Sequence, residues 1–271
     1  MPIVTALYVP GDRPDRFDKA VATGAQLVIV DLEDAVSADR KAMARQAVTT
    51  WLADRPDDGR VRIDVRVNAD DGDDLTAVAR LPEAIGVRLP KVESASTVDE
   101  AAAIVGTARP IVALIETAVG VEAMAAVASH PALAEITLGE ADLASDLGTG
   151  DDAVLDWVRA RLVVVARAAA LPPPMMSVYP ALADLEGLRT DTERGRRMGF
   201  VGRTAVHPSQ LPVIAAAFTP AAAEVDWASA VLAATEDGGV GRIASGEMVD
   251  AAMRGRAQRI LALVTANVRQ P

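Results

Sequence analysis

Two acidic residues that follow apolar stretches are the first candidates for chemistry. Residues 111–115 form one apolar run, which ends at Glu116, and residues 136–138 form another, which ends shortly before Asp142. A carboxylate just past a buried strand lies at the carboxyl end of that strand, where α/β folds bind their ligands. The two acids are 26 residues apart, about one strand–helix unit, so neighbouring parallel strands would bring them together.

Glu116 and Asp142 are therefore predicted to hold a metal ion. Two hard oxygen ligands that leave several coordination positions open suit Mg²⁺. The alternative is that either residue is an ordinary carboxylate at a helix start or a member of a salt bridge.

Other charged residues also follow apolar runs. Glu33 and Asp34 come after residues 27–30, and Lys91 comes after residues 85–89. In a barrel, all of these strand ends face one mouth. Glu33 and Asp34 are candidates for holding metal-bound water, whereas a structural ion pair is the favoured interpretation of Lys91.

Arg66 lies at the end of the run 61–67. A guanidinium group that points into a mouth of carboxylates can bind a substrate carboxylate through two hydrogen bonds. Charge balance for Glu33 or Asp34 is the alternative. The pair His207-Pro208 follows the run 200–206 and is predicted to cap the last barrel helix rather than to act as a base.

Arg13, Arg16 and Lys19 surround the start of the first predicted helix. Cations beside a helix N-terminus suit a phosphate group, although a solvated basic helix face is the commoner arrangement. Taken alone, these residue patterns indicate a metal-dependent enzyme that acts on an oxo acid or a phosphorylated anion.

The elements that must position these residues alternate along the chain. Predicted strands cover residues 5–9, 27–30, 61–67, 85–89, 111–115, 136–138, 175–178 and 200–206, and predicted helices cover 14–23, 37–52, 97–107, 151–171 and 184–198. Strands that alternate with helices at intervals of about 25 residues predict a (β/α)₈ TIM barrel over residues 1–220. A doubly wound open sheet is the alternative, but no Gly-x-Gly-x-x-Gly pattern follows the first strand.

Residues 221–271 extend beyond the predicted barrel. Two helical stretches, 222–236 and 249–268, flank a glycine-rich turn at 238–241. We expect this C-terminal helical extension to act as a lid or an oligomer contact. Plain packing across a subunit interface is equally compatible with the pattern.

Composition limits the classes of function. The 271 residues carry a net charge of −11, and the pI is about 4.7, which argues against general binding of nucleic acid or anionic membranes. The chain has no cysteine and only two histidines, too few for a histidine-built zinc site. Without a signal peptide or an apolar stretch long enough to span a membrane, the sequence predicts a soluble, cytoplasmic protein.

Seven short segments, in order, resemble the HpcH/HpaI aldolase and citrate lyase beta subunit family. They are Tyr8-Val9-Pro10-Gly11-Asp12-Arg13, Val30-Asp31-Leu32-Glu33-Asp34, Arg66-Val67-Asn68, Leu89-Pro90-Lys91, Ile115-Glu116-Thr117, Gly139-Glu140-Ala141-Asp142-Leu143 and Val206-His207-Pro208-Ser209-Gln210. The segment Gly246-Glu247-Met248-Val249-Asp250 is similar to the tail of the acyl-CoA lyase branch.

The resemblance implies a Mg²⁺-dependent lyase of the citryl-CoA or malyl-CoA type. Such an enzyme cleaves or forms a carbon–carbon bond between an acyl-CoA, such as acetyl-CoA, and a 2-oxo acid, such as oxaloacetate or glyoxylate. Glu116 and Asp142 would then bind Mg²⁺, and Arg66 would bind the oxo acid. Asp250 would be a catalytic lid carboxylate supplied by a neighbouring subunit, which implies a homo-oligomer, a trimer or hexamer in the family.

The family contacts the CoA nucleotide at the positions of Tyr8, Arg13 and Lys19. The chain departs from the family pattern at Met175-Met176, where relatives often carry Ile-Asp, and at Arg203, which replaces a common lysine. Two alternatives remain open: an aldolase of the same superfamily that uses pyruvate without CoA, and a non-catalytic metabolite-binding subunit. The acyl-CoA and oxo acid used are not determined by the sequence, because one methylene or hydroxyl changes binding by only about 1–3 kcal/mol.

Overall fold

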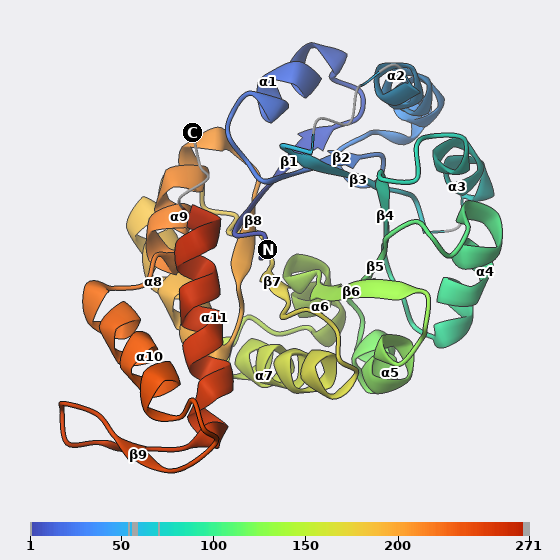
Figure 1. The fold of residues 1–271 in the computed structure, drawn as a ribbon. Helices are drawn as coiled ribbons and strands as arrows, with labels where there is room; N and C mark the ends of the chain where they lie inside the picture. Colours follow the sequence, from blue (N-terminus) through green and yellow to red (C-terminus); the bar gives the residue numbers. More distant parts are fainter. Residues whose placement is uncertain (1, 54, 56–58, 70, 268–271) are drawn as a thin grey trace.

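The computed structural model describes residues 2–53, 55, 59–69 and 71–267, and in this part of the chain eight parallel strands form a barrel (Figure 1). The strands are β1 (Thr5–Pro10), β2 (Leu27–Asp31), β3 (Arg62–Arg66), β4 (Gly86–Leu89), β5 (Ile111–Ile115), β6 (Leu133–Leu138), β7 (Met175–Met176) and β8 (Gly202–Ala205). The predicted (β/α)₈ barrel is thus confirmed, and the doubly wound alternative is wrong.

From β1 to β6, each strand pairs with the next one in the chain, β7 pairs with β8, and β1 pairs with β8. Among the described residues no ladder hydrogen bonds join β6 to β7, so the ring stays open at one seam. Strands β5 and β6 pair with Ile115 opposite Leu138, which brings the ends of these two strands together, as the spacing of Glu116 and Asp142 predicts.

Helices surround the barrel, and a short helical pair follows it. They are α1 (Phe17–Val21), α2 (Lys41–Ala53), α3 (Gly72–Ala79), α4 (Ala95–Val105), α5 (Ala118–Ala128), α6 (Glu140–Leu147), α7 (Asp152–Ala168), α8 (Leu185–Met198), α9 (Leu211–Phe218), α10 (Ala222–Ala234) and α11 (Ala251–Asn267), with 3₁₀ turns at Pro14–Arg16, Ala38–Arg40 and Pro208–Gln210. Polar caps begin several of these helices. Asp184 accepts a hydrogen bond from the Gly187 amide at 2.8 Å, and α8 ends at Gly199, whose φ of 111° is costly for other residues.

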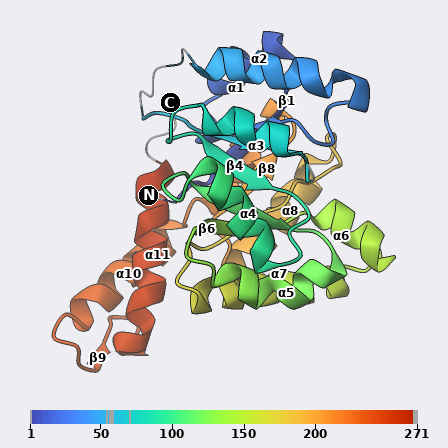
Figure 2. The same cartoon turned by 90° about the vertical axis from the view of Figure 1, so that its right-hand side faces the viewer.

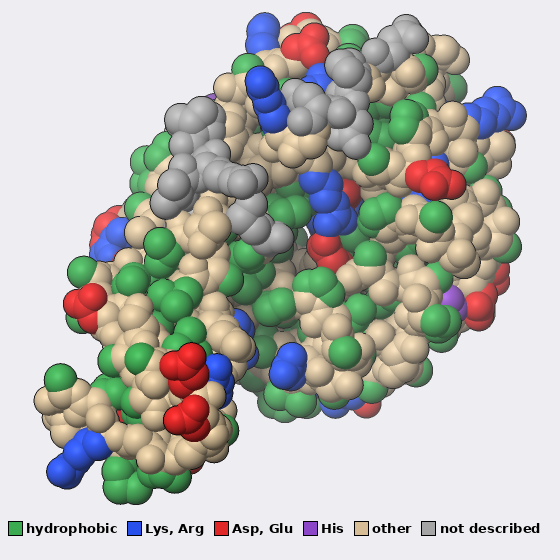
Figure 3. Space-filling model, in the orientation of Figure 1, with side chains coloured by type: hydrophobic (Ala, Val, Ile, Leu, Met, Phe, Trp, Pro, Cys, Tyr) green, Lys and Arg blue, Asp and Glu red, His purple; other side chains and the backbone are tan. Residues whose placement is uncertain are grey.

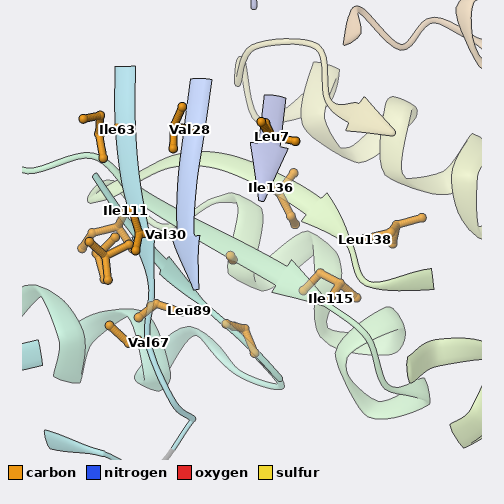
Figure 4. Packing of buried hydrophobic residues seen from close by; sticks show 14 of the residues in the cluster. Leu7, Val28, Val30, Ile63, Val67, Leu89, Ile111, Ile115, Ile136 and Leu138 are labelled. Carbon is orange, nitrogen blue, oxygen red and sulfur yellow. The ribbon is translucent and has the colours of Figure 1, made fainter. Parts of the chain in front are cut away.

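The main core lies between the outer face of the barrel and the helices. Val28 and Val30 of β2, Ile63 of β3 and Ile111 and Ile115 of β5 belong to this layer (Figure 4). Val, Leu, Ile and Ala supply nearly all of it, as expected for a chain with 3% aromatic residues.

The inside of the barrel is partly ionic. Asp64 on β3 accepts hydrogen bonds from Nε of Arg62 and Nε of Arg88, both at 2.9 Å. Asp64 and Arg88 are almost completely buried, so each charge depends on the other for its stability inside the barrel. Acidic and basic side chains gather at the centre of the face seen in Figure 3.

The C-terminal helices have a small hydrophobic core of their own. Ala228 and Val231 of α10 pack with Ala257 and Ile260 of α11, and a hairpin of β9 (Gly241–Arg242) and β10 (Met248–Val249) connects the two helices. This pair projects away from the barrel as an arm, with the hairpin at its outer end (Figures 1 and 2).

Helix α11 packs against the barrel at the end where the strands begin. The side chain of Gln26, just before β2, donates to the Ala266 carbonyl at 3.0 Å, and Leu263 and Ala266 join the main core. Helices α6 and α11 lie on opposite sides of the barrel (Figure 2). Because α6 follows the carboxyl end of β6, the extension of one chain is remote from the mouth of its own barrel.

Local details differ from the predictions. No residue ranges were predicted for helices α3, α5, α6 and α9, the glycine-rich turn is part of a hairpin, and Asp142 lies in the first turn of α6 rather than at a strand end. None of the helices in the described part of the chain combines the length and the apolar character needed to cross a membrane.

Candidate active site

Glu116 is the centre of the candidate site. It follows β5 directly and is 2% exposed. Its Oε1 accepts a hydrogen bond from the Lys91 amide at 2.7 Å, while its Oε2 is buried without a hydrogen-bond partner among the described residues. Burial, reinforced by the negative charges of Glu33 and Asp142, raises the pKa of Glu116 to about 7. A buried carboxylate oxygen without a donor favours a bound cation.

Asp142 approaches Glu116 from the next strand–helix unit. Gly139 makes this approach possible, because a Cβ at that position would lie 2.1 Å from Oε2 of Glu116. The Gly139 amide donates to the carbonyl of Ile115 at 3.0 Å, which fixes the start of α6 beside the end of β5. The structure therefore places the start of α6 against Glu116, and the charge of Asp142 in its first turn acts on the Glu116 carboxyl.

These two carboxylates fit a Mg²⁺ ion. Glu116 offers an unpartnered oxygen in a buried setting, and the half-buried Asp142 supplies a second oxygen donor. Within the described residues, no group of three or more histidine, aspartate or glutamate side chains is arranged to hold a metal ion. Mg²⁺ typically takes one or two protein carboxylates and fills its remaining positions with water or substrate oxygens.

Arg66 is fixed by acidic residues at the end of β3. Its Nε and Nη2 donate to the two carboxylate oxygens of Asp31, each at 2.7 Å, and its Nη1 lies 2.8 Å from Glu33 and 3.4 Å from Asp34. The structure thus contains the ion pairs of the charge-balance interpretation, and substrate binding by Arg66 stays a prediction. Asp31 occupies the Nε–Nη2 edge of the guanidinium, and Glu33 and Asp34 lie against Nη1, so a substrate carboxylate would have to replace the contacts at Nη1.

Asp31 is a residue of the candidate site that the sequence did not single out. It was treated only as part of a motif, yet its pairing opposite Arg66 in the β2–β3 ladder holds the guanidinium in place. An acid and an arginine at the same position on adjacent strands were the available signal.

Glu33 and Lys91 connect the Arg66 cluster to Glu116. The Nζ of Lys91 lies 3.6 Å from Oε1 of Glu33, and burial raises the pKa of the Glu33 carboxyl. Lys91 has a φ of 51°, an uncommon conformation for a residue with a side chain, and in this conformation its amide points at Glu116. The structural ion pair predicted for Lys91 is confirmed, together with a backbone contact that the sequence did not indicate.

The predicted CoA contacts do not form one cluster. The Tyr8 ring belongs to the small apolar group inside the barrel, and the Arg66 guanidinium lies 5.0 Å from its centroid. Arg13 instead donates to the exposed Asp15 at 2.9 and 3.0 Å, and Lys19 is exposed on α1. A contact with CoA remains a prediction for each of the three.

His207 and Asp250 both cap helices. Nδ1 of His207 accepts a hydrogen bond from the Ser209 amide, and the turn that it begins leads into α9, which confirms the predicted capping role. Asp250 is exposed and accepts a hydrogen bond from the Ala252 amide at 2.9 Å at the start of α11. That end of α11 meets the hairpin of the arm, so Asp250 is not part of the Glu116 cluster within one chain.

Fold and site together define a (β/α)₈ barrel with a candidate cation site, built from carboxylates, at the carboxyl ends of its strands. The sequence matches the HpcH/HpaI aldolase/citrate lyase family over residues 5–208 and a second family, described as a C–C bond lyase of the TIM-barrel fold, over residues 165–266. The chain belongs to the HpcH/HpaI aldolase/citrate lyase family.

Curated relatives carry two different names. A (3S)-malyl-CoA thioesterase of Cereibacter sphaeroides is 38% identical over 243 residues, covering 87% of this chain and 84% of the relative. A citrate lyase subunit beta-like protein of Mycobacterium tuberculosis is 35% identical over 262 residues, covering 94% and 93%.

Solved structures of similar proteins contain ligands. A crystal structure of CitE from Mycobacterium tuberculosis with magnesium, acetoacetate and coenzyme A has a TM-score of 0.81 and 33% identity, covering 97% of this chain and 98% of that one. The citrate lyase beta subunit of the same organism with oxaloacetate and magnesium has a TM-score of 0.69 and 34% identity, covering 80% and 96%.

Proposed function

We propose that this protein is a Mg²⁺-dependent lyase for a 3-hydroxyacyl-CoA of the citryl-CoA or malyl-CoA type. The observation that carries the proposal is the buried, unpartnered Oε2 of Glu116 beside Asp142. Magnesium in the similar CitE structures supports the same assignment. When bound by Glu116 and Asp142, Mg²⁺ would supply a Lewis acid that polarises the oxygen at the reacting carbon.

Cleavage breaks the bond between the hydroxyl-bearing carbon and the α carbon of the thioester. The hydroxyl group loses its proton and becomes the carbonyl of the 2-oxo acid, while the bonding electrons form the enolate of the acyl-CoA, which then takes up a proton. Arg66 would hold the carboxylate of the oxo acid through Nη1, where the substrate would replace the contacts with Glu33 and Asp34, because Asp31 occupies the Nε–Nη2 edge. Holding both fragments in this way makes the reverse reaction effectively intramolecular.

Asp250 of another copy would exchange the proton with the α carbon. The arm projects from the barrel, and α11 packs at the end opposite to the mouth, so a carboxylate at the start of α11 can reach a mouth only on a different copy. The proposal therefore requires a homo-oligomer, as expected from the family. Mixing E116Q protein with D250N protein would restore activity in shared oligomers if Asp250 acts in this way, whereas two variants that fail to complement would contradict it.

Hydrolysis of malyl-CoA is a second candidate, favoured by the identity to the (3S)-malyl-CoA thioesterases. One incubation distinguishes the two reactions. With malyl-CoA and Mg²⁺, a lyase releases glyoxylate and acetyl-CoA without a free thiol, whereas a thioesterase releases malate and free CoA. Parallel assays of glyoxylate as its hydrazone and of thiol with a chromogenic disulfide, repeated with methylmalyl-CoA and citryl-CoA, identify the reaction and the substrate.

The CoA-independent pyruvate aldolase remains an alternative. Arg13 and Lys19 test it, because replacing both with alanine should raise KM for acyl-CoA substrates if they contact the nucleotide. Unchanged KM values for every acyl-CoA would favour an aldolase. A non-catalytic subunit would show no turnover with any substrate, and E116Q would then be indistinguishable from the wild type in every activity assay.

A further inference from the structure

A chain of four buried or half-buried charges lies beside the candidate metal site without being part of it. Glu140 of α6, Arg159 of α7, Asp191 of α8 and Arg203 of β8 alternate in sign and contact one another in that order. Glu140, Arg159 and Arg203 are each less than 9% exposed. The series therefore connects four elements of the barrel, α6, α7, α8 and β8, through side chains.

The strongest link is the contact between Arg159 and Glu140. Nε and Nη2 of Arg159 donate to Oε1 and Oε2 of Glu140 at 2.8 and 2.6 Å, a two-pronged geometry that fixes orientation as well as distance. Nη1 donates to Asp191 at 3.0 Å. Arg203 completes the series with contacts of 2.7 Å to Asp191 and 3.0 Å to Thr192.

Glu140 is the first residue of α6, and Asp142 lies in the same helical turn. The Glu140 amide also donates to Oγ of Ser177, just after β7, at 3.3 Å. This segment lies at the seam where β6 and β7 share no ladder hydrogen bonds in the described structure. The Gly139 amide holds the start of α6 to β5, and side-chain contacts hold it on the side of β7, where the described part of the sheet has no ladder hydrogen bonds.

Stability alone does not explain this arrangement. Removing several charges from water is expensive, and a buried ion pair often stabilises a protein no better than apolar side chains of similar size. The two-pronged contact between Arg159 and Glu140, in contrast, fixes the orientation of the Glu140 side chain, which apolar side chains of similar size would not do. The residues that orient a metal ligand typically change metal affinity when they are replaced.

We propose that Arg159 is a positioning residue of the metal site. By holding Glu140, it fixes the first turn of α6 and thereby the position of Asp142 relative to Glu116. This inference rests on the proposed Mg²⁺ site, and it concerns residues to which neither the family resemblance nor the sequence analysis gave a role.

The test uses two variants. R159K keeps the positive charge but cannot make the two-pronged contact with Glu140. The double variant E140Q/R159M removes both charges, so that no buried charge is left unpaired at this contact. R167K is the matched control, because Arg167 is an exposed arginine of the same helix. Binding of Mn²⁺ as a probe is measured by electron paramagnetic resonance, and unfolding of the metal-free proteins is followed in parallel.

We expect both Arg159 variants to fold in the metal-free state and to bind Mn²⁺ about tenfold more weakly than the wild type, while R167K binds normally. Folded R159K or E140Q/R159M protein with wild-type Mn²⁺ affinity would overturn the positioning role. A wild-type protein that binds no Mn²⁺ would instead overturn the metal site itself, so the two failures are distinguishable.

Discussion

Replacing Glu116 with glutamine should stabilise the metal-free protein at alkaline pH while removing a metal ligand. The folded carboxyl has a pKa of about 7, against 4.5 for the unfolded chain. The folded state therefore binds more protons than the unfolded state between these two values, so the free energy of unfolding falls as pH rises through this window. Near neutral pH and above, the buried, ionised Glu116 carboxylate lowers the free energy of unfolding of the metal-free protein.

The magnitude follows from the pKa difference. The raised pKa of Glu116 lowers the free energy of unfolding by about 3 kcal/mol near pH 8 and by less than about 1 kcal/mol near pH 5. The glutamine amide adds an offset that does not depend on pH. The test is therefore how the stability difference between E116Q and the wild type changes with pH. We expect the free energy of unfolding of E116Q, relative to that of the wild type, to increase by about 2.5 kcal/mol from pH 5 to pH 8.

Denaturant unfolding in the presence of a chelator, repeated across this pH range, measures the difference. E122Q is the matched control, because Glu122 is an exposed carboxylate on α5, and it should show no such pH-dependent gain. Parallel wild-type and E116Q curves at every pH would refute the assignment of Glu116 as a carboxyl group that burial keeps protonated. Added Mg²⁺ should reverse the order above neutral pH by stabilising only the wild type.

Further outcomes follow from the same contacts. Affinity of the wild type for Mn²⁺ should fall about tenfold for each pH unit below the pKa of Glu116, because one proton must leave; a pH-independent titration by calorimetry would contradict this. K91G should be more stable than K91A by about 1 kcal/mol, with unchanged Mn²⁺ affinity, since both keep the amide on Glu116; equal unfolding midpoints would argue against strain at Lys91. R66K should raise KM for the oxo acid more than it lowers kcat, and R66M should cost about 3–5 kcal/mol of stability because Asp31 is left unpaired; an unaltered KM in R66K would remove Arg66 from substrate binding. D250N should abolish turnover while leaving Mn²⁺ binding intact, and an active D250N protein would exclude Asp250 as the proton carrier.

Helix α3 illustrates a local limit of sequence reasoning. Its eight residues begin in an acidic stretch, where Asp71 accepts hydrogen bonds from the amides of Asp73 and Asp74. Arg45 of α2 lies 2.5 Å from Asp74 and so neutralises part of that charge. The stretch has the composition of a loop. The buried carboxylate of Asp74 is stabilised there by the ion pair with Arg45, which comes from another helix.

The barrel and its ring of charged residues were accessible from the sequence for a physical reason. Apolar runs that recur at regular intervals must be buried, and parallel strands in a barrel all end at one mouth. Any charged residue just past such a run is therefore placed at that mouth by the topology alone. Glu116 and Asp142 could be predicted together because β5 and β6 are neighbours both in the chain and in the sheet.

Contacts between distant residues were decided only by the tertiary structure. Asp31 and Arg66 are separated by 35 positions and Glu140 and Arg159 by 19. The strand register that pairs Asp31 with Arg66, and the helix packing that pairs Glu140 with Arg159, exist only in the folded chain. The seam between β6 and β7, and the packing of α11 at the end opposite to the mouth, likewise depend on how the whole ring closes. The sequence determined which residues face the mouth, and the closed fold determined which of them are paired and which oxygen of Glu116 is left without a partner.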